Sequence, residues 1–89
     1  MAAKFHDHFF SREERYSVGE ETESHRLYLS IPVSNGLVDY EEYYEITREQ
    51  YDAFAADLSL AAVFAEECRR HEHDDLLIQK PGWNRGTPV

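Results

Sequence analysis

The chain has 89 residues, which fits a single domain (residues 1–89) with a small core, and its 42% hydrophobic content argues against wholesale disorder. One cysteine cannot form an intramolecular disulfide, and no apolar run is long enough for a membrane span or a signal peptide, so we expect a soluble, cytoplasmic protein. Eighteen acidic and nine basic residues give a formal net charge of −9, which disfavours direct nucleic-acid binding, because that binding depends on lysine and arginine, and favours a basic protein partner.

The N-terminal region predicts one strand and leaves the structure before it open. Phe5 and Phe9 have the spacing of one helical turn, but the same segment also suits an extended lead-in. Residues 13–20 alternate weakly through Tyr16 and Val18, which predicts a strand, and turn-forming residues follow. We expect this strand to join an antiparallel sheet.

Residues 25–46 are predicted to form the central β-hairpin of that sheet. Apolar and polar residues alternate in its first half, and Asn35-Gly36 is a strong signal for a tight hairpin turn. With a two-residue turn at this point, Val33 faces Val38 and the apolar side chains of both strands share one face. A slip of one residue would bring carboxylates opposite the leucines, so only shifts that preserve the two faces stay open.

Two residues conflict with the predicted pairing of the hairpin. Pro32 falls at a hydrogen-bonded position and has no N–H to donate, which predicts a lost bond or a bulge near the turn. Glu42 lies on the otherwise apolar face, where a carboxylate needs water or a partner such as His25.

Two short helices are predicted after the hairpin. Thr47 and Gln50 form a capping box, so the first helix begins there. The apolar stripe changes sides near Asp57, which predicts a break, with Ser59 as the cap of a second helix that ends near His71. These helices are expected to cover the apolar face of an antiparallel sheet of about three to four strands, which makes a small α+β domain.

The C-terminal region predicts a short strand and then a tail. Leu76, Leu77 and Ile78 can supply a short buried strand. Residues 81–86 (PGWNRG) are typical of consecutive turns. Trp83 is expected to dock against the end of the core, and a free recognition segment stays open as the alternative.

The sequence predicts no catalytic or cofactor site. His71 and His73 follow Cys68, but two histidines at this spacing point to nearly opposite sides of a helix, and no CxxC or HExxH spacing is present. A metal on this cluster stays open. Glu66 and Glu67 disfavour a nucleophilic thiolate at the neighbouring cysteine. We therefore expect no enzymatic activity, no metal and no cofactor.

The polar face of the hairpin is the candidate binding surface. Tyrosine is enriched among the residues that dominate protein–protein binding, and carboxylates around it would orient a basic partner. The competing interpretation is a solvated sheet face without a further role. The predicted partner-binding residues are Tyr28, Asp39, Glu41, Tyr43 and Glu45 on the hairpin and Glu20, Glu21 and Glu23 at the adjoining turn.

In size, acidity and lack of catalytic motifs, the chain is similar in general character to bacterial immunity proteins and antitoxins that neutralise a nuclease toxin. This likeness implies an inhibitor whose carboxylates, such as Asp39, Glu41 and Glu45, take the places of substrate phosphates in the basic cleft of the partner. A phage-type inhibitor that mimics nucleic-acid charge would use the same physics. The alternative from a different class is a homo-oligomeric structural or accessory subunit, for example a homodimer.

Overall fold

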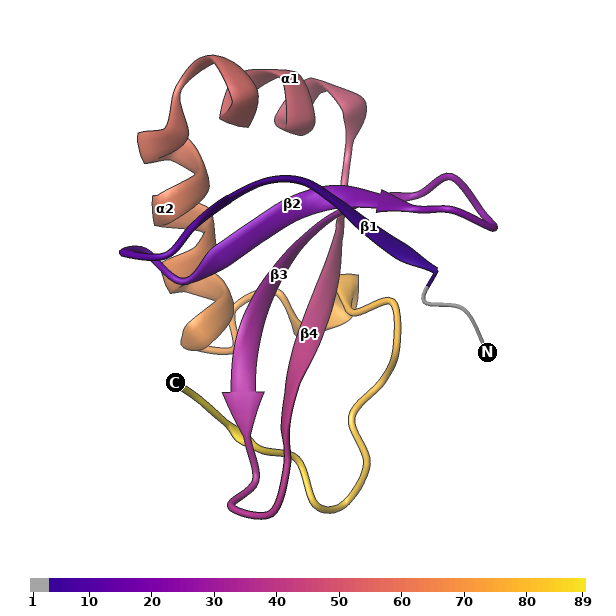
Figure 1. Ribbon diagram of the computed structural model, residues 1–89, viewed down its shortest axis with the longest axis vertical. Helices are drawn as coiled ribbons and strands as arrows, with labels where there is room; N and C mark the ends of the chain where they lie inside the picture. Colours follow the sequence, from indigo (N-terminus) through magenta and orange to yellow (C-terminus); the bar gives the residue numbers. More distant parts are fainter. Residues whose placement is uncertain (1–3) are drawn as a thin grey trace.

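The computed structural model describes residues 4–89 and shows an antiparallel sheet with two helices against one face (Figure 1). The predicted small α+β architecture is confirmed, and residues 1–3 of the predicted domain lie outside the described residues. Its elements in chain order are β1 (Phe5–Ser11), β2 (Tyr16–Glu21), β3 (Leu27–Ser34), β4 (Asp39–Ile46), α1 (Arg48–Ala56), α2 (Leu58–Arg69), a 3₁₀ turn η1 (Asp74–Leu76) and β5 (Thr87–Pro88).

The N-terminal segment, whose structure the sequence left open, is a strand with a bulge. β1 pairs with β2, and the register shifts between Asp7 and Phe9, so that His8 is the extra residue. A bulge of one residue exchanges the two faces of a strand. Phe9 therefore packs against the helix-covered core, whereas Phe5 lies on the opposite face of the sheet. A helical turn would have placed the two rings on one side, whereas the bulge places them on opposite faces of the sheet.

β1 also folds across the sheet, and a glycine permits this close approach. A Cβ atom on Gly19 of β2 would lie 2.0 Å from the carbonyl oxygen of His6, so any larger residue would push β1 away. In the observed position the ring of Phe5 stacks on Tyr43 of β4, with the ring centroids 3.6 Å apart. Figure 1 shows β1 crossing in front of β3 and β4.

The β3–β4 hairpin has the predicted faces in a different register. Val33 pairs with Tyr40 and not with Val38, because the turn takes in residues 35–38 and not two residues only. The side-chain oxygen of Asn35 accepts hydrogen bonds from the N–H groups of Leu37 and Val38, both at 3.0 Å, and these bonds stabilise the longer turn. The pairing moves by an even number of residues, so every side chain keeps its predicted face.

The observed register removes the conflict at Pro32. The N–H of Asn35 donates to the carbonyl of Val38 at 3.2 Å, and hydrogen-bonded pairs alternate with non-hydrogen-bonded ones, so Pro32 and Glu41 form a non-hydrogen-bonded pair. The nitrogen of Pro32 therefore points away from β4, toward the opposite edge of β3. Pairing with β2 along that edge has already ended at Ser30, so no ladder hydrogen bond is lost. The predicted bulge does not occur, since the β3–β4 ladder is continuous, and β5 pairs with the remaining edge of β3.

The helices begin at side-chain caps, one of them as predicted. Gln50 N–H donates to Thr47 Oγ1 at 3.0 Å and Thr47 N–H donates to Gln50 Oε1 at 2.8 Å, which confirms the capping box of α1. The predicted break near Asp57 is also present. The cap of α2 is Asp57 and not Ser59: its carboxylate accepts from Ser59 N–H at 3.0 Å, because a negative charge is favoured at the start of a helix.

The hydrophobic core lies between the sheet and the two helices. The strands contribute fully buried residues such as Val18 and Leu29, and Phe54 of α1 packs against Phe64 of α2 with ring centroids 5.6 Å apart. Within residues 4–89, no helix combines the length and the apolar content that a membrane span requires.

The tail (residues 79–89) covers the part of the apolar face that lies near the β3–β4 turn. Gly86 N–H donates to the Tyr40 hydroxyl at 2.6 Å, and a Cβ atom on Gly86 would lie 2.6 Å from the Ser34 carbonyl, so the tail packs directly on the hairpin backbone. Arg85 reaches Glu42 and Asp74 with pairs of hydrogen bonds of 2.8 to 3.0 Å. The ion-pair partner of Glu42 is therefore Arg85 and not His25, which pairs with Glu20.

Two predictions for the C-terminal region are wrong. Trp83 is 97% exposed and does not dock against the core. Arg85 occupies the end of the core instead and neutralises the buried carboxylate of Glu42, which a tryptophan could not do. The strand predicted at residues 76–78 is reduced to one antiparallel bridge between Leu77 and Tyr44, since η1 occupies the residues before it.

Candidate partner-binding surface

β1 covers part of the predicted binding face and makes one of its hairpin residues inaccessible. Tyr28 is fully buried, where Phe5 packs edge to face against it with ring centroids 5.5 Å apart, and its hydroxyl donates to Asp7. Tyr43 lies beside Tyr28 at 4.9 Å but is diagonal to it, and Phe5 stacks on its ring. The expectation of an outward-facing Tyr28 is therefore wrong, because the crossing of β1 depends on contacts that sequence alternation does not reveal.

The three acidic residues of the β2–β3 turn do not form a common surface. Glu21 is buried and accepts hydrogen bonds from the N–H groups of Glu23 and Ser24, both at 3.0 Å, so it holds the turn together. The hydrogen bond from the Ser24 hydroxyl is the main cause that lowers the pKa of Glu21. Glu20 lies 2.8 Å from His25, and Glu23 is exposed. Of the three, Glu23 is the one whose side chain is free to meet a partner.

Glu41 retains the features expected of a binding residue. Its half-buried carboxylate accepts a hydrogen bond from the Ser30 hydroxyl at 2.9 Å. Burial raises the pKa of Glu41, and the charge of Asp7 raises it further. In the described part of the chain, no arginine, lysine or histidine forms an ion pair with Glu41, Asp39 or Glu45. β4 thus presents negative charge that the protein itself does not neutralise.

The same surroundings predict a loss of stability in alkali. Burial, followed by the charges of Glu41 and Asp7, raises the pKa of Tyr43 to about 12. A group with a raised pKa in the folded state contributes stability below its unfolded value, near pH 10, and this stability is lost as the pH rises toward 12. We expect the free energy of unfolding to fall above about pH 10, and Tyr43→Phe to make that fall shallower. Urea unfolding across this pH range checks it, and an unchanged slope in the variant would contradict it.

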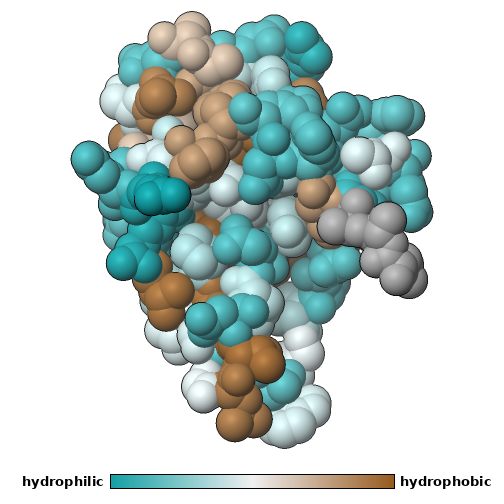
Figure 2. Space-filling view, viewed as in Figure 1, coloured by the Kyte–Doolittle hydropathy of each residue, from teal (hydrophilic) through white to brown (hydrophobic). Residues whose placement is uncertain are grey.

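The end of the molecule at the β3–β4 turn exposes large apolar side chains. Trp83 is 97%, Leu37 92% and Val38 58% exposed. Leu37 and Trp83 line the same hollow of about 530 Å³ between the turn and the tail. Figure 2 shows hydrophobic residues gathered at this lower end. Exposed aromatic and aliphatic side chains in one place are typical of protein–protein interaction sites.

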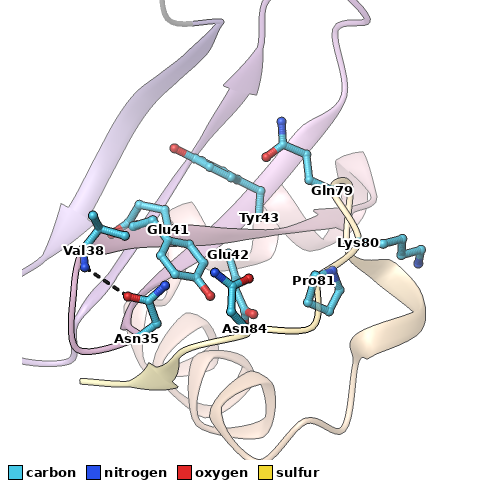
Figure 3. Close-up of a pocket in the computed structure, with 11 residues that line it drawn as sticks. Asn35, Val38, Glu41, Glu42, Tyr43, Gln79, Lys80, Pro81 and Asn84 are labelled. Atoms are coloured by element: carbon cyan, nitrogen blue, oxygen red, sulfur yellow. Dashed lines mark hydrogen bonds between the residues drawn. The ribbon is translucent and has the colours of Figure 1, made fainter.

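A second hollow of about 300 Å³ follows the outer edge of β4, on the side of the tail (Figure 3). Glu41 and Tyr43 line it from the strand, and residues 79–82 and 84 line it from the tail. Asn35 and Asn84 line both hollows, so the two are neighbours. We refer to this second hollow as the β4-edge groove. The name hairpin-tip surface denotes Leu37, Val38, Asp39, Glu41 and Trp83.

The residues considered for a metal do not converge. Cys68 is fully buried, and burial raises the pKa of its thiol, which disfavours the thiolate that a metal or a reaction would require. His73 stacks on Phe64 at 4.5 Å and hydrogen-bonds Glu67 at 2.8 Å. His71 is exposed beyond the end of α2. Among the described residues, no three metal-ligating side chains lie together.

The sequence did not predict Leu37 and Val38 as surface residues, because the two-residue turn placed Val38 inside the strand. The signal that could have found them is the run of two apolar residues directly after Asn35-Gly36.

No protein-family model matches this chain, and neither the curated proteins nor the solved structures include a significant match.

Proposed function

We propose that this protein is a small acidic binding protein that inhibits a basic partner by covering its cleft. The observation that carries the proposal is the hairpin-tip surface, where exposed Trp83 and Leu37 share a hollow and β4, which starts two residues after Leu37, carries carboxylates that form no ion pair in the described residues. Burial of the apolar side chains would supply affinity, and the carboxylates would attract and orient a cationic surface. A solvated sheet face needs neither feature.

The proposed partner is a nucleic-acid-directed protein, in the manner of the nucleases that immunity proteins and antitoxins neutralise. Asp39, Glu41 and Glu45 lie at odd positions of β4 and therefore on one face of the strand. Such a row of carboxylates can replace phosphates against arginine and lysine, and the net charge of −9 adds long-range attraction. A phage-type inhibitor that mimics nucleic-acid charge uses the same contacts.

The test is retention of basic proteins from the native host on the immobilised protein, followed by mass spectrometry. We expect the double variant Asp39→Asn with Glu41→Gln to lower retention about tenfold or more, with a weaker salt dependence, because it removes two charges without changing the size of either side chain. Trp83→Ala should lower retention as well but leave the salt dependence intact. The retained protein, once purified, should lose its nucleic-acid activity when the wild-type protein is added in equal amount.

The matched control is Glu13→Gln with Glu49→Gln, which makes the same change in net charge at exposed positions in the β1–β2 turn and on α1. Equal loss of retention in the two double variants would show that only net charge matters and would contradict the hairpin-tip surface as the binding site. A retained partner whose nucleic-acid activity does not respond would contradict inhibition.

Self-association is the competing function, and one observation on α2 favours it. Leu60 is 45% and Val63 59% exposed on this helix, one turn apart. A homo-oligomeric subunit would bury them against a second copy. Light scattering of the pure protein distinguishes the two functions: we expect a monomer, and a dimer that Leu60→Gln and Val63→Gln dissociate would favour the subunit instead.

A further inference from the structure

The outer edge of β4 has unused backbone groups next to the turn. Hydrogen-bonded pairs with β3 fall on alternate residues, so Asp39 and Glu41, which belong to non-hydrogen-bonded pairs, direct their N–H and C=O groups away from β3. An open strand edge of this kind is a template for another extended chain. The β4-edge groove lies directly beside it.

The protein itself shows that this edge accepts backbone hydrogen bonds. The carbonyl of Tyr43, which has the same orientation as that of Glu41, accepts the N–H of Ile78 at 2.9 Å. Leu77 makes an antiparallel bridge to Tyr44. The chain leaves the edge after Ile78 and passes around the groove, so the pairing that begins at Tyr43 is not continued toward the turn.

The groove has polar side chains that suit an extended peptide. Figure 3 shows Asn35 and Asn84 in the space between β4 and the tail, and Gln79 lies at its other end. A carboxamide can donate to a peptide C=O and accept from a peptide N–H, so Gln79 and Asn84 can bond the edge of an inserted strand that β4 does not reach. The oxygen of Asn35 already accepts from Leu37 and Val38, which leaves its NH₂ group as a donor. At about 300 Å³ the groove holds a short segment and not a domain.

The acidic side chains beside the groove favour a basic segment, and the one base that lines it, Lys80, directs its ammonium group to the carbonyls of Asp74 and Asp75. Side chains at alternate positions of a strand lie on one face, and along the open part of its edge β4 carries Asp39 and Glu41 on this face, neither of which forms an ion pair among residues 4–89. The other acid that lines the groove, Glu42, is already neutralised by Arg85. An extended segment with lysine or arginine at every second position is complementary to this row.

We propose that an extended, basic segment of the partner adds to the outer edge of β4 as a further strand within the β4-edge groove. This inference rests on the proposed function and specifies how that partner is held. Backbone hydrogen bonds with Asp39 and Glu41 supply the affinity, whereas the carboxylates at alternate positions read the spacing of the positive charges.

A synthetic peptide of alternating lysine and valine tests the inference, with a peptide of the same composition whose lysines form one block as its control. NMR titration should show shifted amide signals of Asp39 and Glu41 and slower hydrogen exchange at both. We expect the alternating peptide to bind on the order of tenfold more tightly than the block peptide, because only alternation places each lysine opposite a carboxylate. Equal affinities, or signal changes away from residues 39–43, would overturn the inference.

Asp39→Pro and Asp39→Ala separate the backbone contribution from the charge. Both variants remove the carboxylate, but only proline removes the N–H that points away from β3 at the outer edge, and proline is tolerated at the first residue of an edge strand. We expect Asp39→Pro to bind the alternating peptide several-fold more weakly than Asp39→Ala, because the loss of about one backbone hydrogen bond lowers affinity by that factor. The amide map of the wild-type protein provides the same test should the proline variant fold poorly.

Failure of this inference differs from failure of the proposed function. A basic host protein that depends on the charges of Asp39 and Glu41, but whose binding leaves hydrogen exchange at both amides unchanged, overturns strand addition and leaves the proposed inhibitor standing. Loss of both the charge dependence and the amide protection overturns both.

Discussion

Arg85→Met is expected to lower the free energy of unfolding by about 3–5 kcal/mol, a large part of the stability of a small domain. Arg85 is the hydrogen-bond partner of Glu42, whose side chain is only 5% exposed and which also accepts from the Tyr44 hydroxyl at 2.9 Å. Methionine fills a similar volume but leaves this carboxylate buried without a cation. The penalty of that unpaired charge is the main reason for the expected loss.

Arg85 also joins the tail to the rest of the fold, so its replacement should have a local effect. The guanidinium bonds Asp74 as well as Glu42, and the neighbouring Gly86 packs on the hairpin backbone. We expect residues 79–89 of the variant to become accessible to proteolysis and hydrogen exchange before the sheet unfolds. Urea unfolding followed by circular dichroism measures the global effect, and amide exchange measures the local one.

Two comparisons make the Arg85 prediction specific. Arg26→Met removes an exposed arginine that forms no ion pair within residues 4–89, and it should change stability by less than about 0.5 kcal/mol. Adding Glu42→Gln to Arg85→Met should recover most of the loss, because the amide is neutral and can still accept from Tyr44. A double variant as unstable as Arg85→Met alone would show that tail packing, and not the buried charge, dominates.

The effect of Arg85→Met should also depend on pH. Hydrogen bonding to Arg85 is the main cause that lowers the pKa of Asp74. A carboxyl with a lowered pKa contributes stability above its unfolded value, about 3.9, and loses that contribution as the pH falls through its folded value. The variant lacks this contribution at neutral pH, so the gap between the two proteins should narrow on acidification. Asp74 is partly exposed, which keeps this part of the effect small.

Local patterns in the sequence were sufficient to predict which face of the hairpin is buried and where α1 begins. The alternation of residues 27–33 and 40–46 assigns each side chain to a face, and a shift of the strand pairing by an even number of residues leaves that assignment unchanged. The Thr47 capping box is a contact between residues three positions apart. The register itself was missed because Asn35 stabilises a longer turn through its side chain, a choice that the Asn-Gly pair alone does not reveal.

The candidate site was predictable only in part, because its missing features depend on contacts between distant residues. Arg85 and Glu42 are 43 positions apart, and no local pattern indicates that they pair or that Trp83 is left exposed. Tyr28 appeared accessible because alternation describes two faces of a flat sheet, whereas β1 folds over one of them. Asp39 and Glu41 keep their predicted place on the strand because that place follows from alternation alone.

The crossing of β1 leads to the second large expected effect, from Gly19→Ala. The added methyl group would lie 2.0 Å from the carbonyl oxygen of His6 and 2.8 Å from the Cα atom of Asp7, and backbone atoms cannot move aside as a flexible side chain does. We expect a loss of about 1–3 kcal/mol or more, the usual result of forcing atoms into a filled space. Urea unfolding measures the loss.

Gly82→Ala is the matched control, because its methyl group would meet only the side-chain oxygen of Asn84, at an ordinary 3.4 Å. The same substitution there should change stability by less than about 0.5 kcal/mol. Similar stabilities for the two variants would contradict the close passage of β1 over β2. A selective loss at Gly19 would show that the strand pair is held at this distance.

Gly19→Ala should also uncover the polar face of the hairpin. If β1 retreats, Phe5 no longer stacks on Tyr43, and the burial that raises the pKa of Tyr43 to about 12 is reduced. The pKa of Tyr43 should then fall toward the ordinary value of about 10, which titration of tyrosinate absorbance detects. Because Glu41 loses part of its cover in the same change, a basic partner should reach its carboxylate more easily in this variant than in the wild-type protein. Weaker binding would instead mean that β1 is itself part of the binding surface.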